Sequence, residues 1–478
     1  MTITEPALVA DSQEALGGRF ALSALSAGRE PAAPETIGRW LADFAQRAYT
    51  TVERVPLDRL EGWERAPDTS YLRHHSGKFF SIEGLEVEAP GAVVPRWCQP
   101  IINQPEVGIL GILVKEFDGV PHLLMQAKVE PGNRNGLQLA PTVQATRSNY
   151  LRVHGGRPVP YLEYFRDLTG RQVIADVRQS EQGSWFLGKR NRNMVVEAEG
   201  EVEVLDGFRW LSLGQVHRLL AEDDVINMDA RTVLSCLPYT GAQLGAALGC
   251  DGDDFRSALV RSCVTDRARQ TLGDHLSWIT DTRTMTEVRR RPVPLDGLTG
   301  WRLHDGEITH EDGSYFRVIG VRVTAGGREV ARWSQPMIEP CGPGVIAFVV
   351  RQFAGVLHVL VRLGAEAGSV DTAELAPTVQ CNPENYARLP RPELLDVVLG
   401  ASEEQIRFDT MLSEEGGRFH HALNRYLVVE AEVEAPSPAF RWMTLRQLSG
   451  LLRHSHYLNV EARTLVACLH SLAGRQES

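Results

Sequence analysis

The chain has less basic charge than acidic charge. Its 478 residues include 50 Lys and Arg against 61 Asp and Glu, a formal net charge of -11. No basic tract stands out, as it would on a face that binds nucleic acid. The composition therefore argues against binding to a duplex, and an anionic substrate would have to be held by local Arg and Lys.

Cysteine is scarce, and long apolar runs are missing. The seven cysteines are scattered, with no Cys-x-x-Cys pair and no Cys/His cluster at zinc spacing, so they are expected to be buried thiols in a reducing compartment. No stretch of about 18 uncharged apolar residues occurs. The first 35 residues lack the basic start and apolar run of a secretory signal. These absences predict a soluble cytoplasmic protein.

The chain does contain a long internal repeat. Arg-Trp-Cys-Gln-Pro at 96–100 recurs as Arg-Trp-Ser-Gln-Pro at 332–336, and Leu-Ala-Pro-Thr-Val-Gln at 139–144 recurs at 375–380. A spacing this long far exceeds the roughly 20–50 residues of a solenoid unit. Each copy, at about 200 residues, is large enough to bury a core of its own. The chain is therefore a tandem duplication of a whole domain.

The repeat divides the chain into four parts. We expect a loosely ordered lead-in with one short helix, a first domain, a structured linker with a helix over 255–264, and a second domain. Their predicted bounds are 1–34, 35–237, 238–272 and 273–470.

Local patterns predict the same elements in both copies. The β-branched runs 108–117 and 120–127 flank the turn pair Asp118-Gly119, which is typical of a hairpin. The second copy repeats this pattern around Ala354-Gly355. Each copy then has a late strand, over 194–204 or 427–433, followed by Phe-Arg-Trp and helices. Strands first and helices last, without steady β-α-β alternation, indicate an α+β domain with a mixed or antiparallel sheet.

Longer motifs add a family resemblance. The two repeated motifs, together with Ser-Glu-Gln-Gly-Ser-Trp-Phe at 180–186, Lys-Arg-Asn-Arg-Asn-Met-Val-Val-Glu at 189–197 and Ser-Glu-Glu-Gly-Gly-Arg-Phe at 413–419, resemble the NDP-hexose 2,3-dehydratases. The similarity spans residues 35–470. It implies two tandem Nudix-like domains, each a mixed sheet flanked by helices, a homodimer, and a lyase of deoxysugar biosynthesis for antibiotics.

The resemblance also implies a reaction. A base removes the C3 hydrogen of a dTDP-4-keto-6-deoxyhexose, the C2 hydroxyl departs, and the enol becomes a 3,4-diketo-2,6-dideoxy sugar nucleotide. No cofactor is expected. The protein must supply a base, an acid and a donor to the enolate oxygen. A positioned acid or base contributes roughly 10²- to 10⁴-fold, and one oxyanion donor about 2.7–4 kcal/mol.

Nucleotide binding requires a stacking face for thymine and cations or amides for the diphosphate. In the first copy the candidates are Trp63, Arg96, Trp97, Gln99, Gln144, Asn149 and Tyr150. In the second copy they are Trp301, Arg332, Trp333, Gln335, Gln380, Asn385, Tyr386 and Arg418. Core packing is the competing interpretation for the tryptophans, and a salt bridge for Arg96 and Arg332. The repeat allows two nucleotide pockets per chain.

Differences between the copies favour the first as the reacting one. Gly364 stands in the place of Lys128, and Ala422 in the place of Lys189. The catalytic candidates are Lys128, Tyr161, Glu163, Tyr164 and Lys189, with base and acid unassigned. The alternative pocket would use Arg362, Glu415, Arg418, His420 and His421 of the second copy.

Two other functions compete with the dehydratase. A Nudix-type pyrophosphatase needs a helix with Arg-Glu-x-x-Glu-Glu, whose clustered carboxylates hold Mg²⁺, and that motif is absent from the sequence. No metal site is therefore expected. A non-catalytic nucleotide-sugar-binding protein would have no need of one chemically richer copy.

Overall fold

A computed structural model describes residues 5–26, 34–147, 158–326, 331–387 and 389–475. Two seven-stranded sheets, one per copy, dominate the molecule, and in each of them one pair of strands is parallel and the others are antiparallel. The first sheet comprises β6 (Gly108–Phe117), β7 (Val120–Val129), β8 (Leu137–Ala140), β9 (Val143–Ala145), β10 (Gln172–Ser180), β11 (Arg190–Glu197) and β12 (Phe208–Ser212). The second comprises β18 (Gly344–Phe353), β19 (Val356–Gly364), β20 (Glu374–Ala376), β21 (Val379–Cys381), β22 (Ile406–Ser413), β23 (Leu423–Glu430) and β24 (Phe440–Met443).

The predicted hairpins are confirmed as β6–β7 and β18–β19. Asp118 and Ala354 open the two turns with φ of 48° and 49°, and a glycine with positive φ follows each of them. Such left-handed pairs match the twist of the flanking strands. The late strands are displaced from their predicted bounds, because β11 ends at Glu197 and β23 at Glu430.

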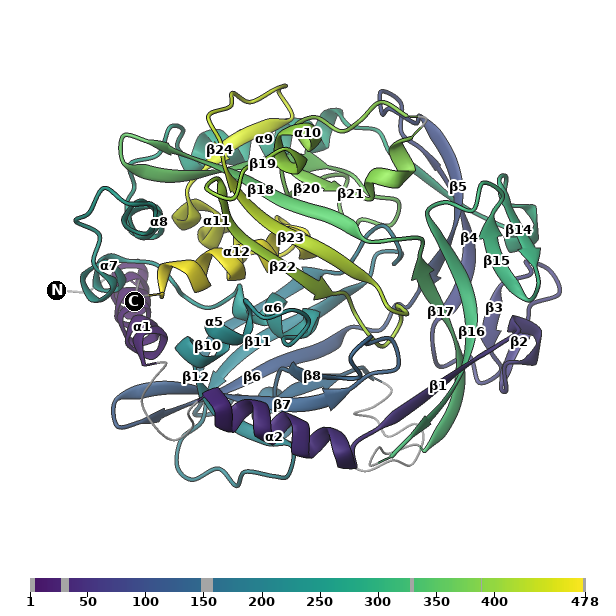
Figure 1. Cartoon of the computed structure of the whole chain (residues 1–478), viewed down its shortest axis with the longest axis horizontal. Helices are drawn as coiled ribbons and strands as arrows, with labels where there is room; N and C mark the ends of the chain where they lie inside the picture. The colour runs from purple at the N-terminus through teal and green to yellow at the C-terminus, as the bar shows by residue number, and fades with distance from the viewer. Residues whose placement is uncertain (1–4, 27–33, 148–157, 327–330, 388, 476–478) are drawn as a thin grey trace.

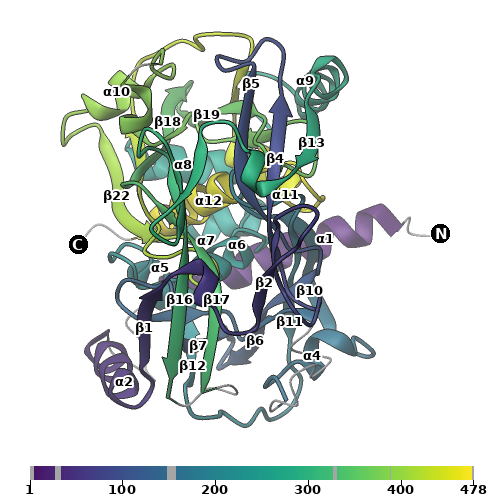
Figure 2. The same ribbon diagram turned by 90° about the vertical axis from the view of Figure 1, so that its right-hand side faces the viewer.

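Two smaller five-stranded sheets form one side of the molecule and exchange strands between the copies (Figures 1 and 2). β1 (Thr50–Val55) of the first copy pairs with β16 (Phe316–Ala325) of the second, and β13 (Arg289–Val293) pairs with β4 (Ser81–Glu88). The other strands of these sheets are β2 (Trp63–Arg65), β3 (Leu72–His74), β5 (Arg96–Asn103), β14 (Trp301–His304), β15 (Glu307–His310) and β17 (Arg332–Pro340). The sequence gives no sign of this exchange, which interlocks the two copies.

Helices fill the space between the two large sheets (Figure 1). They are α5 (Leu213–Leu219), α6 (Met228–Leu234), α11 (Leu445–Leu452) and α12 (Val460–Ala473), with α7 (Ala242–Leu248) and α8 (Phe255–Val264) of the linker beside them. Their apolar side chains join those of both sheets in one buried cluster. The outlying helices are α2 (Pro34–Arg47), α4 (Glu163–Arg166), α9 (Leu272–Met285) and α10 (Leu395–Leu399), with short 3-10 helices at Leu57–Arg59, Leu295–Gly297 and Pro383–Tyr386. None of the described helices could span a membrane.

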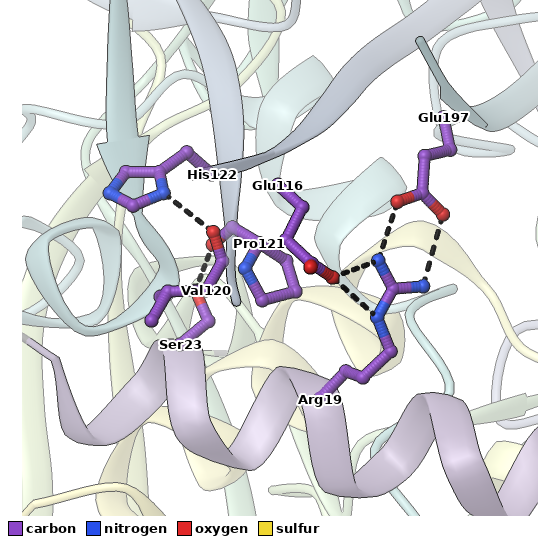
Figure 3. Close-up of polar contacts among 7 residues, drawn as sticks. All are labelled: Arg19, Ser23, Glu116, Val120, Pro121, His122 and Glu197. Carbon is purple, nitrogen blue, oxygen red and sulfur yellow. Dashed lines mark hydrogen bonds and ion pairs between the residues drawn. The ribbon is translucent and has the colours of Figure 1, made fainter. Parts of the chain in front are cut away.

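The lead-in is more ordered than the sequence predicts. It forms α1 (Glu5–Leu25), a 21-residue helix whose Phe20 is 1% exposed. Figure 3 shows how α1 is fixed to the first large sheet: Arg19 forms ion pairs with Glu116 and Glu197, and the Ser23 hydroxyl donates to the Pro121 carbonyl. For the described residues 5–26 the expectation of loose order was wrong, because the partners that fix α1 come from distant strands.

α6 and α12 meet at the centre through two fully buried arginines. Arg231 donates to Thr464 Oγ1 and to the Ser413 carbonyl, while Arg463 donates to Thr232 Oγ1 and to the Ser180 carbonyl. Both guanidinium groups are 0% exposed. Each arginine therefore holds the start of a motif in the opposite copy, and we call these two motifs, residues 180–186 and 413–419, the crossing segments.

Candidate active site

Charged and amide side chains of both copies meet beside the first large sheet, in a group we call the first centre. Its members are Lys128, Glu130, Gln144, Glu181, Lys189, Asn227 and Asp229 of the first copy, with Glu415 and Arg418 of the second. The second crossing segment delivers the last two.

A chain of amides orients Glu130 within the first centre. Gln144 Nε2 donates to Glu130 Oε1 at 2.8 Å, and Asn227 Nδ2 donates to Gln144 Oε1 at 3.2 Å. Asn227 is itself fixed, because its Oδ1 caps α6 by accepting from the Ala230 N–H at 2.8 Å. Lys128 Nζ lies 3.6 Å from Glu130 Oε1. These contacts hold a lysine and a carboxylate side by side.

Glycines allow the second crossing segment to approach this closely. The Gly132 N–H donates to the Gly416 carbonyl at 2.7 Å, and a Cβ at Gly132 would lie 1.7 Å from the Phe419 carbonyl oxygen. Any larger residue at 132 would push the segment away. At the end of the segment, Arg418 packs over the Phe80 ring at 4.3 Å and donates to Gln104 Oε1 at 3.1 Å.

Burial changes the proton affinity of the groups in the first centre. Glu181 is 4% exposed, and burial raises its pKa even though Arg463 and Lys189 oppose the shift. Burial likewise raises the pKa of Asp229 well above its ordinary value, reinforced by the charges of Glu181 and Glu415. Lys189, which donates to the Glu106 carbonyl, has a pKa lowered by burial.

Within the first centre, Glu415 has a pKa suited to proton transfer near neutrality. Burial raises it to about 7, with Arg418 acting against the shift and Glu130 and Glu181 adding to it. Among the described residues, Glu415 Oε2, Glu181 Oε2 and Asp229 Oδ1 are buried without a hydrogen-bond partner. Such atoms are uncommon in folded proteins, and they mark this centre as a candidate functional site.

The second copy has an equivalent group, the second centre, in which Glu366 and Glu414 are hydrogen-bonded, whereas Glu374 Oε1 is buried without a partner among the described residues. Gln380 and Asn459 repeat the amide chain to Glu366, at 3.0 and 2.8 Å. The first crossing segment supplies the remaining hydrogen bonds to the Glu366 carboxylate: the Ser184 hydroxyl donates to Oε1 at 2.6 Å and the Gly183 N–H donates to Oε2 at 3.1 Å.

The neighbouring Glu414 of the second centre accepts from Asn424, Tyr426 and Gln182. Glu461 Oε2 is the counterpart of the orphan atom in Asp229. Within the parts of the chain that the structure describes, no three His, Cys, Asp or Glu side chains are arranged to hold a metal ion.

Four ionisable groups of the first centre have no ionisable counterpart in the second. Where the first centre has a charged side chain, the second has a neutral one, in the pairs Lys128/Gly364, Lys189/Ala422, Glu415/Gln182 and Arg418/Trp185. The structure therefore brings the predicted residues Lys128, Lys189, Gln144 and Arg418 together. It also separates the alternative set, because Arg362 lies near Glu366 and Tyr386 in the second centre, while His420 pairs with Glu339 and stacks on His421.

The other catalytic candidates lie around α4, on the sheet face opposite to α6. Tyr161 Oη donates to the Glu203 carbonyl at 2.8 Å, accepts from the Leu205 N–H at 2.9 Å and packs with Phe208. Tyr164 lies beneath the Arg171 guanidinium at 4.4 Å. In the described structure no contact joins Tyr161, Glu163 or Tyr164 to the first centre, and the observed contacts of the tyrosines are those of packing residues.

The repeated Arg-Trp-x-Gln-Pro motif holds the crossing segments. Gln99 Nε2 donates to the Ser184 carbonyl, and Gln335 Nε2 donates to the Gly417 carbonyl, both at 2.7 Å. Trp97 and Trp333 donate to the side-chain oxygens of these glutamines. The two glutamines thus position the loops that supply each centre.

Four of the remaining binding candidates, Trp63, Trp301, Arg96 and Asn385, have contacts within the fold. Trp63 and Trp301 donate across the copies to the carbonyls of Ser334 and Cys98, at 2.7 and 2.8 Å. Arg96 pairs with Glu86, which also pairs with Arg291 of the exchanged strand β13. Arg332 is exposed, Asn385 accepts from the Tyr315 N–H, and Asn149 and Tyr150 lie outside the described residues.

The model of the NDP-hexose 2,3-dehydratase family matches residues 34–237 and 272–469. This chain belongs to that family. It is 50% identical over 460 residues to the dTDP-4-dehydro-6-deoxy-alpha-D-glucopyranose 2,3-dehydratase of Saccharopolyspora spinosa, with 95% of each chain covered. Proteins of the same description from Amycolatopsis orientalis and Streptomyces violaceoruber are 47% and 49% identical, over 96% and 91% of this chain and 94% and 96% of theirs. The resemblance inferred from the motifs is confirmed, as is the α+β architecture of two repeated units.

Proposed function

We propose that this protein is a hydro-lyase that removes the C2 hydroxyl of a dTDP-4-keto-6-deoxyhexose and yields a 3,4-diketo-2,6-dideoxy sugar nucleotide. The relatives that carry this activity in their names align with nearly the whole chain at 47–50% identity. The same reaction follows from the family to which both copies belong.

We place the reaction at the first centre. The observation that carries this assignment is the set of four ionisable groups that the second centre lacks. Elimination beside a ketone needs groups that take up and release protons, together with a cation near the oxygen that gains negative charge. Only the first centre has an orphan glutamate together with two lysines among the described residues.

The cations of the first centre have separate roles in this proposal. Lys189 is 6% exposed and bonds to the Glu106 carbonyl, so its ammonium is held rigidly enough to donate to the C4 oxygen of the enolate. Lys128 and Arg418 are more exposed and bind the diphosphate, for which Arg offers two parallel donors. Gln144 keeps Glu130 and Lys128 in place.

Further properties are proposed from the sequence repeat, the composition and the family resemblance. We propose that each copy is a Nudix-like domain within the predicted bounds, that the protein acts as a homodimer in the cytoplasm, and that its product enters antibiotic biosynthesis. The second centre, with the half-buried Arg362 and a fully hydrogen-bonded Glu366, is proposed to bind nucleotide without reacting.

The mass of the sugar nucleotide after incubation with the purified protein tests the proposed reaction. We expect loss of one water molecule from a dTDP-4-keto-6-deoxyhexose. Cleavage to dTMP and a sugar phosphate would instead identify a pyrophosphatase. An unchanged mass, with binding detected by calorimetry, would identify a non-catalytic binding protein, and either result would overturn the proposal.

A further inference from the structure

Glu415 belongs to the second copy by sequence but to the first centre by position. The Arg231 bond to Ser413 and the Gly132 bond to Gly416 fix the segment on both sides of it. Its own Oε1 accepts from the Gly417 N–H at 3.1 Å, which leaves Oε2 as the uncommitted oxygen. The side chain is therefore oriented by its own loop and not by a partner within the first copy.

The pseudo-symmetry of the molecule shows which contacts the residue at this position makes in the second centre. Gln182 is the counterpart of Glu415, and its Nε2 donates to Glu414 Oε2 at 2.7 Å. The glutamine in the second centre therefore supplies a hydrogen bond to the neighbouring carboxylate of Glu414. A glutamate at the same place instead adds a carboxyl group whose charge interacts with that of Glu181, so the two groups cannot both ionise without a cost in free energy.

We propose that Glu415 is the acid-base catalyst of the elimination, delivered to the first centre by the second copy. This inference rests on the proposed function. The carboxylate of Glu415 takes the C3 proton, and the C–H electrons form a C3=C4 double bond with the negative charge on the C4 oxygen. The charge then returns, C4=O reforms, C2=C3 forms, and the C2–O bond breaks. The departing hydroxide takes the same proton from Glu415 and leaves as water, which restores the carboxylate.

The geometry of the substrate class permits one group to make both transfers. In a hexose ring of the gluco configuration, the C3 hydrogen and the C2 hydroxyl lie on the same face, on adjacent carbons. A pKa of about 7 further suits a group that must accept and then release a proton near neutral pH. The charged groups that face Glu415 are Arg418 on its own segment, Glu130 after β7, Glu181 after β10, Lys189 before β11 and Asp229 on α6.

The test is Glu415→Gln in the full-length protein, assayed in D₂O for deuterium at C3 of recovered substrate and for loss of water. Glutamine is accommodated at the equivalent position of the second copy, so the fold should be kept, and a thermal melt checks this. We expect kcat to fall by about 10²- to 10⁴-fold with KM nearly unchanged, and deuterium uptake at C3 to fall equally. Glu415→Asp should recover part of the rate, and the exposed Glu403→Gln should match the wild type.

The possible failures are distinguishable. If the wild type does not release water, the proposed function fails. If the wild type releases water and Glu415→Gln keeps its rate, or raises only KM, Glu415 is not the catalyst. If Glu415→Gln still exchanges the C3 hydrogen but no longer eliminates water, another residue is the base, and the dual role is overturned.

Discussion

At the scale of single residues, the two copies act as a comparison built into one chain. Lys128 and Lys189 could be predicted from sequence, because Gly364 and Ala422 occupy their places in the other copy. Glu415 could not be placed with them, since its destination depends on a loop that crosses between copies. Tyr161 was chosen for its chemistry, but its hydroxyl is committed to the backbone at Glu203 and Leu205.

Replacing Lys189 with Met should separate catalysis from folding. Met retains most of the apolar stem, so the buried core stays filled while the donor to the developing enolate disappears. We expect kcat to fall by about 10²- to 10³-fold. The melting temperature should stay the same or rise, because a buried ammonium is removed. Steady-state rates and thermal melts check both, and an unchanged kcat would remove Lys189 from the mechanism.

Glu415 should also contribute to the pH dependence of the free energy of unfolding. Its pKa is raised to about 7 in the folded state from an ordinary value of 4.5. A carboxyl with a raised folded-state pKa contributes stability that is fully present below the unfolded value and is lost as pH rises through the folded value. The wild type should therefore lose stability relative to Glu415→Gln between about pH 4.5 and pH 7. Melting temperatures of both proteins at pH 5 and pH 8 give the comparison, and a difference independent of pH would contradict the shift.

At the scale of elements, the positions of strands and hairpins could be predicted from the sequence, but the pairing of strands between the two copies could not. The turn pair at Asp118-Gly119 specifies a hairpin locally, so β6 and β7 could be predicted. The pairing of β1 with β16 could not be predicted. Nothing in the local sequence of Thr50–Val55 indicates whether this strand pairs within the first copy or with the second. The order of α1 likewise depends on Glu116 and Glu197, far away in sequence.

The cap of α6 links an element to the first centre. Asn227→Ala removes the bond from the Ala230 N–H and the donor to Gln144, so we expect a loss of about 1 kcal/mol in unfolding free energy. Asn459→Ala at the equivalent cap of α12 should cost a similar amount. Urea unfolding measures both. Only the Asn227 variant should also lose activity, and equal activity losses would argue against a reacting site confined to the first centre.

At the scale of the whole molecule, the duplication is an interlocked pair. The exchanged strands, the shared buried cluster and the reciprocal arginines all cross between copies. The number of repeated units could be predicted from the repeat. The exchange of strands could not, because the hydrophobic pattern of each strand is the same whether it pairs within its own copy or with the other.

Separating the copies should therefore abolish folding of each. Residues 1–240 expressed alone would expose the edge of β4 and the apolar surfaces that the second copy covers. We expect aggregation or a molten state, and recovery of soluble, active protein when 1–240 and 241–478 are produced together. Circular dichroism and gel filtration of each half provide the measurement. A folded, cooperative half would contradict the interlocked architecture.

The most direct measurement for the central claim, that water leaves at the first centre alone, compares Gln144→Met with Gln380→Met. These glutamines make the same two hydrogen bonds in the two centres, so the structural cost of each change is matched. We predict that Gln144→Met lowers the rate of water loss by about 10²-fold through misplacement of Glu130 and Lys128. The Gln380→Met rate should stay close to that of the wild type. A larger loss in Gln380→Met than in Gln144→Met would contradict the assignment.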